Sequence, residues 1–210
     1  MAPQDLILQH PSKPRRLLLL FHGVGSNAHS MVPLGQALAP HVPEAAVVSV
    51  QAPQLAGPAA QWFSVQGITE ANRPARVEAA MPAFVQAVRR WQQACGVGPE
   101  ETVLVGFSQG AIMALESSQI DPPPAARVIA LSGRFARPPR VAPASVRLHL
   151  IHGDADAVMP LRLAADGLAQ FQALGGSATL DELPGLSHGI DARVLDAIVR
   201  RLQEARPASH

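Results

Sequence analysis

Short runs rich in apolar residues alternate along the chain with longer stretches in which apolar residues recur every three or four positions. The short runs have the length and continuous hydrophobicity of β-strands that are buried on both faces. They occupy residues 16–21, 46–50, 102–105, 127–131 and 147–151. Residues 179–183 are predicted to form the last strand, and a further run at 6–9 suits a short edge strand. The stretches with helical periodicity occupy residues 31–40, 76–95, 111–116, 161–174 and 191–204.

This alternation predicts a doubly wound, mostly parallel sheet with helices on both faces. No repeat and no linker interrupts it, and 210 residues, 48% of them hydrophobic, are enough to bury the core of one domain. We therefore expect a single α/β domain over residues 1–210, with a disordered tail at 205–210. The connection at 51–70 is rich in Gly, Pro and Gln, and a loop of this length favours a functional role.

Charge and cysteine content exclude several classes of function. The formal net charge is only +1 and Lys13 is the one lysine, so nothing favours a nucleic-acid partner. Cys95 has no second cysteine to pair with, which favours a structural thiol. The apolar run that follows Arg16 is too short for a signal peptide, and no segment has membrane-spanning length. We expect a cytoplasmic protein with no stable membrane insertion.

The pentapeptide Gly106-Phe107-Ser108-Gln109-Gly110 lies between a predicted strand and a predicted helix. It matches G-x-S-x-G, the nucleophile elbow, in which a sharp turn holds the serine in strained dihedrals with its hydroxyl exposed. Glycine is needed at 106 and 110 because a β-carbon would collide where strand and helix approach most closely. The alternative is a Gly/Ser turn without a catalytic role, and the residues at the other strand ends decide between them.

A serine, an acid and a histidine all follow strand ends, where ligands of a parallel sheet bind. Ser108, the pair Asp154 and Asp156, and His188 each follow a different predicted strand. This chain order, Ser, Asp, His, is the one expected of an α/β-hydrolase. His188 is the candidate base. We favour Asp156 as the acid and keep Asp154 as the alternative, because an Asp next to Gly often caps its own turn.

An oxyanion hole for such a serine needs two backbone N–H groups. Gln109, the residue after the nucleophile, is the first candidate. Val24 is the second, since it lies in a turn after an early strand and the glycines on both sides let the backbone approach a substrate carbonyl. We therefore expect Val24 and Gln109 to stabilise the developing negative charge.

The turn around Val24 also suggests a rival class of protein. Residues 23–28, GVGSNA, satisfy the dinucleotide fingerprint G-x-G-x-x-G/A. That fingerprint expects an acid at the end of the second strand, where this chain has Val50-Gln51, and it leaves the serine, aspartate and histidine unexplained. A third hypothesis is a hydrolase fold without catalysis that serves as a binding module, which an intact triad with no turnover would favour.

Three further histidines are expected to be structural. His22 and His152 stand beside glycines at strand ends, where we expect them to bond across neighbouring turns. His149 lies within an apolar run and is expected to be a satisfied core residue. The remaining histidines show no spacing typical of metal ligands.

Four motifs, in order along nearly the whole chain, resemble the phospholipase/carboxylesterase family of small α/β-hydrolases, which includes the acyl-protein thioesterases. They are FHGVG at 21–25, GFSQG at 106–110, HGDAD at 152–156 and LSH at 186–188, and residues 61–69 and 110–117 resemble a bacterial serine-esterase branch. The resemblance implies that Ser108 is the nucleophile, His188 the base and Asp156 the acid. It implies that Val24 and Gln109 donate the oxyanion hydrogen bonds.

Together these observations predict a serine esterase for short- to medium-chain acyl esters or thioesters, acting through an acyl-enzyme with no cofactor and no metal. The chain leaves little room for a large lid. Trp62 and Phe63 are either core aromatics or a substrate-facing wall, and Met159 and Leu161 are candidates for an acyl pocket. Two departures from the family, Ser26 and Ser64 in place of acids, bear on the preferred substrate rather than on activity.

Overall fold

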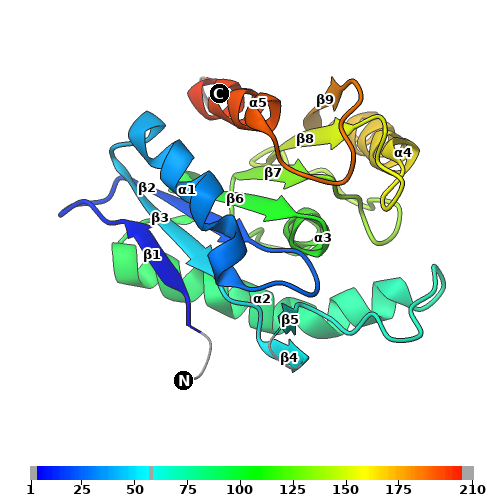
Figure 1. Cartoon of the computed structure of the whole chain (residues 1–210), viewed down its shortest axis with the longest axis horizontal. Coiled ribbons are helices and arrows are strands. Elements are labelled where there is room, and N and C mark those ends of the chain that lie inside the picture. Colours follow the sequence, from blue (N-terminus) through cyan, green and yellow to red (C-terminus); the bar gives the residue numbers. More distant parts are fainter. Residues whose placement is uncertain (1–3, 57–58, 205–210) are drawn as a thin grey trace.

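The strands form a seven-stranded sheet in the order β1-β3-β2-β6-β7-β8-β9, and only β1, at one edge, is antiparallel to its neighbour (Figure 1). The computed structural model describes residues 4–56 and 59–204, so the predicted tail at 205–210 lies outside the described residues. The predicted α/β fold is confirmed. The strands are β1 Leu6–Gln9, β2 Arg16–Phe21, β3 Ala45–Val50, β6 Thr102–Phe107, β7 Arg127–Leu131, β8 Arg147–Gly153 and β9 Ser177–Leu183.

Helices cover both faces of the sheet, as the sequence predicts. α1 (Val32–Leu38) and α5 (Ala192–Gln203) pack on one face (Figure 1). α2 (Arg73–Cys95), α3 (Gln109–Ser117) and α4 (Leu161–Ala173) pack on the other. Short 3₁₀ turns occupy Ala28–Met31, Ala39–His41 and Pro99–Glu101.

The central strand β2 shows why the apolar runs are continuous. Leu17, Leu19 and Phe21 belong to the core beneath α2, α3 and α4, whereas Leu18 and Leu20 belong to the core beneath α1 and α5. Successive side chains of a strand point to opposite faces, and both faces are covered here. Every second residue is therefore buried on one side, and those between are buried on the other.

Several elements differ from the sequence prediction. The connection at 51–70 contains a small hairpin, β4 (Gln54–Ala56) and β5 (Ala59–Gln61), which its Gly-, Pro- and Ala-rich sequence did not indicate. α2 begins three residues early at Arg73, since Pro74 fits the first turn of a helix, where its missing N–H is not needed. β6 extends to Phe107 because its pairing with β7 continues to Leu131.

Within residues 4–56 and 59–204, no helix is both long enough and apolar enough to cross a membrane. The longest described helix, α2, has 23 residues; its buried positions fall on one stripe, and its charged residues, four arginines and Glu78, lie outside that stripe.

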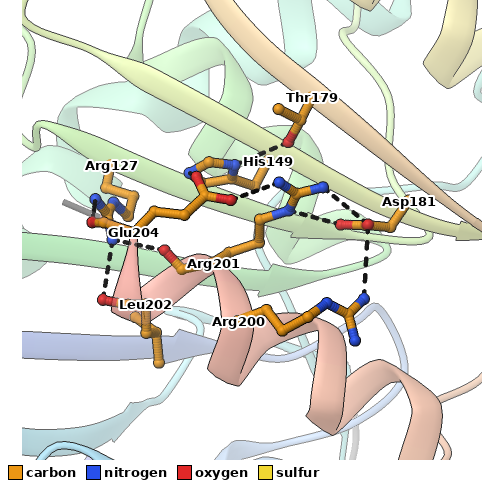
Figure 2. A network of polar contacts seen from close by, with 8 residues as sticks. All are labelled: Arg127, His149, Thr179, Asp181, Arg200, Arg201, Leu202 and Glu204. Atoms are coloured by element: carbon orange, nitrogen blue, oxygen red, sulfur yellow. Dashed lines mark hydrogen bonds and ion pairs between the residues drawn. The ribbon is translucent and has the colours of Figure 1, made fainter. Parts of the chain in front are cut away.

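A network of charged side chains fixes the end of α5 to strands β7 and β9 (Figure 2). From β7, the Arg127 guanidinium donates hydrogen bonds to the backbone carbonyls of Arg201, Leu202 and Glu204, at 2.7, 3.2 and 3.0 Å. Arg201 makes a two-pronged ion pair with Asp181 of β9, with both N···O distances at 2.8 Å. The carbonyls at the helix end, which lack partners within the helix, are thereby satisfied.

His149 lies under this network, and only one of its ring nitrogens is satisfied. Nδ1 is 2.9 Å from the Thr179 hydroxyl, whereas buried Nε2 has no hydrogen-bond partner among the described residues and lies 3.9 Å from a Glu204 carboxylate oxygen (Figure 2). His149 is thus a core residue, as expected, but it is satisfied at only one of its two ring nitrogens. Burial lowers the pKa of His149 to about 4; Glu204 opposes this shift, and Arg127 is one of the nearby arginines that add to it.

We expect this histidine to make folding stability depend on pH. An unfolded chain binds a proton at histidine below about pH 6.5, whereas folded His149 binds one only near pH 4. Stability is therefore lost as the pH falls from about 6.5 to 4, by about 2 kcal/mol at pH 5 relative to pH 8. Urea unfolding of the wild type and of His149→Gln at both pH values measures this loss, which should be smaller in the variant.

The matched control is His29→Gln, because the side chain of His29 is exposed and takes no part in this network. It should retain the pH dependence of the wild type. If His149→Gln and the wild type lose the same free energy of unfolding between pH 8 and pH 5, the expected contribution of His149 is wrong.

Candidate active site

Ser108 occupies a sharp, strained turn between β6 and α3. Its φ is 52° and its ψ is −112°, a conformation that residues with a side chain rarely adopt. A β-carbon at Gly106 would come within 2.5 Å of the backbone of Ala111, and one at Gly110 within 2.2 Å of the Phe21 carbonyl oxygen. Both glycines are thus needed for the close approach of β6, α3 and β2, as the sequence predicts.

His188 lies between the serine and a buried aspartate. Its Nε2 is 3.0 Å from the Ser108 Oγ, and its Nδ1 is 2.7 Å from an Asp156 carboxylate oxygen. The His188 ring also lies against the ring of Phe107, with centroids 5.1 Å apart. The three residues that the sequence singles out, from the ends of β6, β8 and β9, are therefore brought together in a hydrogen-bonded chain.

Backbone hydrogen bonds hold Asp156 in a charged, fixed state. Its Oδ1 accepts from the N–H groups of Val158 and Met159, at 2.9 and 2.8 Å, and leaves Oδ2 for His188. Burial alone would raise the pKa of Asp156, but the hydrogen bonds from Met159, His188 and Val158 outweigh it and lower the pKa below its ordinary value. The carboxylate is therefore ionised at neutral pH.

Asp154, the alternative acid, has a different position. Its carboxylate accepts a 2.6 Å hydrogen bond from the Gly185 N–H in the loop after β9, and its side chain is exposed. Nearby, a β-carbon at Gly153 would come within 1.9 Å of the Leu186 carbonyl oxygen, and the Ala155 N–H donates to that same oxygen at 3.1 Å. The end of β8 thus fits tightly against the loop that carries His188.

His152 supports the turn that carries Asp156. Its Nε2–H donates to the Met159 carbonyl at 2.7 Å and lies 3.4 Å from the Asp156 carboxylate, and the side chain is fully buried. Its other nitrogen has no hydrogen-bond partner among the described residues. These contacts agree with the structural position expected from the sequence.

The turn that contains Val24 lies directly against the serine. A β-carbon at Gly23 would be 3.3 Å from the Ser108 Cβ, so only a residue without a side chain fits there easily. Hydrogen bonds to β5 hold the other end of the turn: the Gly25 N–H donates to the Ala60 carbonyl at 3.1 Å, and the Ala60 N–H donates to the Ser26 carbonyl at 2.7 Å. The unexpected hairpin therefore braces this turn.

His22 fixes the start of the same turn. Its Nδ1–H donates to the Gly23 carbonyl at 2.7 Å, and its Nε2 accepts from the Ala52 N–H at 3.1 Å. Burial lowers the pKa of His22, although the hydrogen bond to Gly23 opposes the shift. The ring is thus neutral at pH 7 and takes the structural position that the sequence suggested.

Gln109 joins the elbow to the long connection before α2. As the first residue of α3, its backbone N–H has no acceptor within the helix and lies beside Ser108. The side-chain oxygen of Gln109 accepts from the backbone N–H of Trp62 at 2.7 Å, and its side-chain nitrogen donates to the backbone carbonyl of Phe63 at 2.8 Å. The backbone N–H of Gln109 therefore lies at the Ser108 turn, whereas its side chain bonds to the long connection before α2.

A cavity of about 320 Å³ opens beside Ser108. Phe63 and Met159 line it, whereas Leu161, the other expected acyl-pocket residue, does not. Trp62 does not line it either: the indole is 1% exposed, packs against Phe21 and Phe84, and donates its N–H to the His22 carbonyl. Of the two alternatives for Trp62, the structure supports a core aromatic and corrects its expected place in the substrate wall.

The cavity also contains three charged residues that the sequence did not single out. They are Glu70, Arg73 and Arg134, and they come from the end of the long connection, the start of α2 and the loop after β7. No motif or spacing links positions so far apart. The only signal was the place of Glu70 in the connection at 51–70, whose length and composition favour a functional role.

Two other features of the described chain bear on ligands. A larger groove of about 900 Å³ runs between α2 and the loop after β7 and contains none of the predicted site residues. Among residues 4–56 and 59–204, no group of three or more His, Cys, Asp or Glu side chains has an arrangement that would hold a metal ion.

The site and fold match a known family. The model of the phospholipase/carboxylesterase family matches residues 3–205. Esterase YpfH of Escherichia coli (strain K12) is 47% identical over 210 residues, which cover 99% of this chain and 90% of the relative. Acyl-protein thioesterase 1 of Neurospora crassa is 24% identical over 216 residues, covering 90% of this chain and 86% of the relative.

A solved structure agrees with these relatives. The crystal structure of esterase PE8 has a TM-score of 0.86 and 31% identity, and the match covers 95% of this chain and 97% of that one. The chain therefore belongs to the phospholipase/carboxylesterase family and is a hydrolase that acts on ester bonds. The dinucleotide-binding alternative is not supported, because the glycine turn that suggested it packs against Ser108.

Proposed function

We propose that the protein is a serine esterase in which Ser108, His188 and Asp156 form the catalytic triad. The observation that carries the proposal is the hydrogen-bonded chain from the Ser108 Oγ through both nitrogens of His188 to the buried Asp156 carboxylate. The strained backbone of Ser108 and the lowered pKa of Asp156 support the same assignment, because both are typical of a nucleophile elbow and its acid.

In the proposed reaction, His188 Nε2 takes the hydroxyl proton as the Ser108 oxygen attacks the carbonyl carbon of an ester or thioester. Asp156 orients the ring through Nδ1 and stabilises the imidazolium that forms. The N–H groups of Val24 and Gln109 donate to the oxyanion. The tetrahedral intermediate collapses, His188 protonates the leaving alcohol or thiol, and water activated by the same ring then hydrolyses the acyl-enzyme to release the acid.

We propose short- to medium-chain acyl groups on a small molecule as the substrate. A cavity of about 320 Å³ is near the lower end of the range for small-molecule sites. Phe63 and Met159 give it apolar walls, which suit an acyl chain. Cytoplasmic location stays a prediction from the sequence.

The experiment that tests this proposal is hydrolysis of p-nitrophenyl esters from acetate to palmitate, together with labelling by a fluorophosphonate. We expect activity that peaks at short or medium chains, and one phosphonylated residue, Ser108, in a digest analysed by mass spectrometry. Activity that rises steadily to palmitate and requires a lipid interface would contradict the proposed chain length. A folded protein that neither turns over nor becomes labelled would instead be a binding module on a hydrolase fold.

A further inference from the structure

The cavity beside Ser108 carries an excess of positive charge among mostly apolar walls. Arg73 and Arg134 both line it, and Glu70 is the only acidic residue of the lining. Glu70 bridges the two arginines: one carboxylate oxygen is 3.0 Å from Arg73 Nη2, and the other is 2.6 Å from Arg134 Nη2. Two guanidinium groups therefore share one carboxylate within a pocket that also contains the serine hydroxyl.

The two arginine side chains are largely buried, whereas the carboxylate faces the solvent. The side chain of Arg134 is 7% exposed and that of Arg73 is 17% exposed, but that of Glu70 is 72% exposed. The Nε of Arg73 is buried without a hydrogen-bond partner among the described residues. A buried guanidinium is costly unless it is well paired, and here the pairing group is shared and open to water.

This arrangement suits a second carboxylate. A guanidinium presents several N–H donors in one plane and binds a carboxylate through two of them at once, yet each arginine gives Glu70 only one nitrogen. An incoming carboxylate would supply the negative charge that the pair of arginines lacks. Because Glu70 is exposed, it can turn toward water while the arginines stay in place.

Resting on the proposed esterase function, we propose that the preferred substrates are esters or thioesters that carry a second, anionic group, a carboxylate bound by Arg73 and Arg134. The aliphatic part of such a substrate packs on Phe63 and Met159. The reaction remains hydrolysis of the ester bond by water. The carboxylate takes no part in bond making and serves to bind and orient the substrate.

The test compares two p-nitrophenyl esters of equal length, the hemiadipate, which ends in a carboxylate, and the neutral hexanoate. The measured quantity is the ratio of their kcat/KM values. We expect the wild type to favour the hemiadipate, and Arg73→Gln and Arg134→Gln each to lower the ratio about tenfold, the effect of one lost charge-assisted pair. Glu70→Gln should raise the ratio, because it removes the competing carboxylate.

The matched control is Arg89→Gln, which makes the same change of charge at an exposed position of α2 outside this cavity. It should leave the ratio within about twofold, and 0.5 M NaCl should reduce the preference of the wild type. A second pair, 4-acetoxybenzoate and phenyl acetate, carries the carboxylate on the alcohol side. Whichever pair responds to Arg73→Gln shows on which side of the ester the arginines bind it.

The outcomes separate this inference from the esterase proposal. If the wild type hydrolyses the neutral esters but neither ratio responds to Arg73→Gln or Glu70→Gln, the three residues form only a structural ion pair and the inference is wrong. These two variants alter partly exposed side chains, so the test does not depend on Arg134, the more deeply buried arginine, tolerating substitution. If no ester is hydrolysed, the esterase proposal itself fails.

Discussion

Replacing Ser108 with alanine is expected to lower kcat for p-nitrophenyl butyrate by at least about 10⁴-fold. The change removes the attacking oxygen, so no acyl-enzyme can form, and His188 Nε2 loses the group that lies 3.0 Å away. Alanine keeps the β-carbon and the backbone of the elbow, so the fold should be retained. Hydrolysis assays of the wild type and the variant measure kcat, circular dichroism measures retention of the fold, and fluorophosphonate labelling measures loss of the reactive serine.

The matched control is Ser132→Ala. Ser132 is also buried at a strand end, that of β7, and its φ of 46° resembles that of Ser108. It differs in that its hydroxyl makes no hydrogen bond to His188 in the described part of the chain, so its loss should change kcat by less than about tenfold. The assignment of the nucleophile is wrong if Ser108→Ala keeps a tenth of the wild-type activity, or if both variants lose activity equally.

Replacing Asp156 with asparagine is expected to lower kcat by about 10⁴-fold, while Asp154→Asn stays within about tenfold of the wild type. The carboxylate of Asp156 accepts from His188 Nδ1 and from two backbone N–H groups. Asparagine can keep the backbone bonds through its oxygen, but its amide then presents N–H to the ring and favours the wrong tautomer. The kcat values of the two variants on p-nitrophenyl butyrate make the comparison.

The pair of aspartates is an internal control, because both lie after β8 and both substitutions remove one negative charge. Asp154→Asn keeps an oxygen that can accept from the Gly185 N–H, so the loop before His188 should hold its position. A larger loss for Asp154→Asn than for Asp156→Asn would show that the acid is misassigned. Equal and large losses would point to a shared effect on the loop rather than to a triad.

The sequence predicts the sheet well because its central strands are covered on both faces. β2 and β7 appear as uninterrupted apolar runs, and their predicted bounds match the structure. The three candidate triad residues were found for a related reason: each follows a predicted strand, and the carboxyl ends of parallel strands share one edge of the sheet. Chain order then indicated which side chains would meet.

Features that depend on side-chain contacts between distant segments could not be predicted. The β4–β5 hairpin is held through Ala60, which bonds to the turn after β2, and alanine gives no strand signal. The bridge from Arg73 through Glu70 to Arg134 joins two segments about sixty positions apart in the chain. Tryptophan is a residue type found both in binding sites and in cores. Only the neighbours of Trp62 in space, Phe21 and Phe84, show that it belongs to the core.

The two hydrogen bonds made by the Gln109 side chain set a limit on how this enzyme can be re-engineered. They fix the backbone at Trp62 and Phe63, and therefore one wall of the cavity, to the residue that follows Ser108. A library that exchanges the segment between β3 and α2 can vary side chains freely only where it preserves those two backbone positions. Grafts that shift these positions by one residue would displace both the cavity wall and the turn at Ser108. We therefore expect such grafts to change substrate selectivity and to lower turnover at the same time.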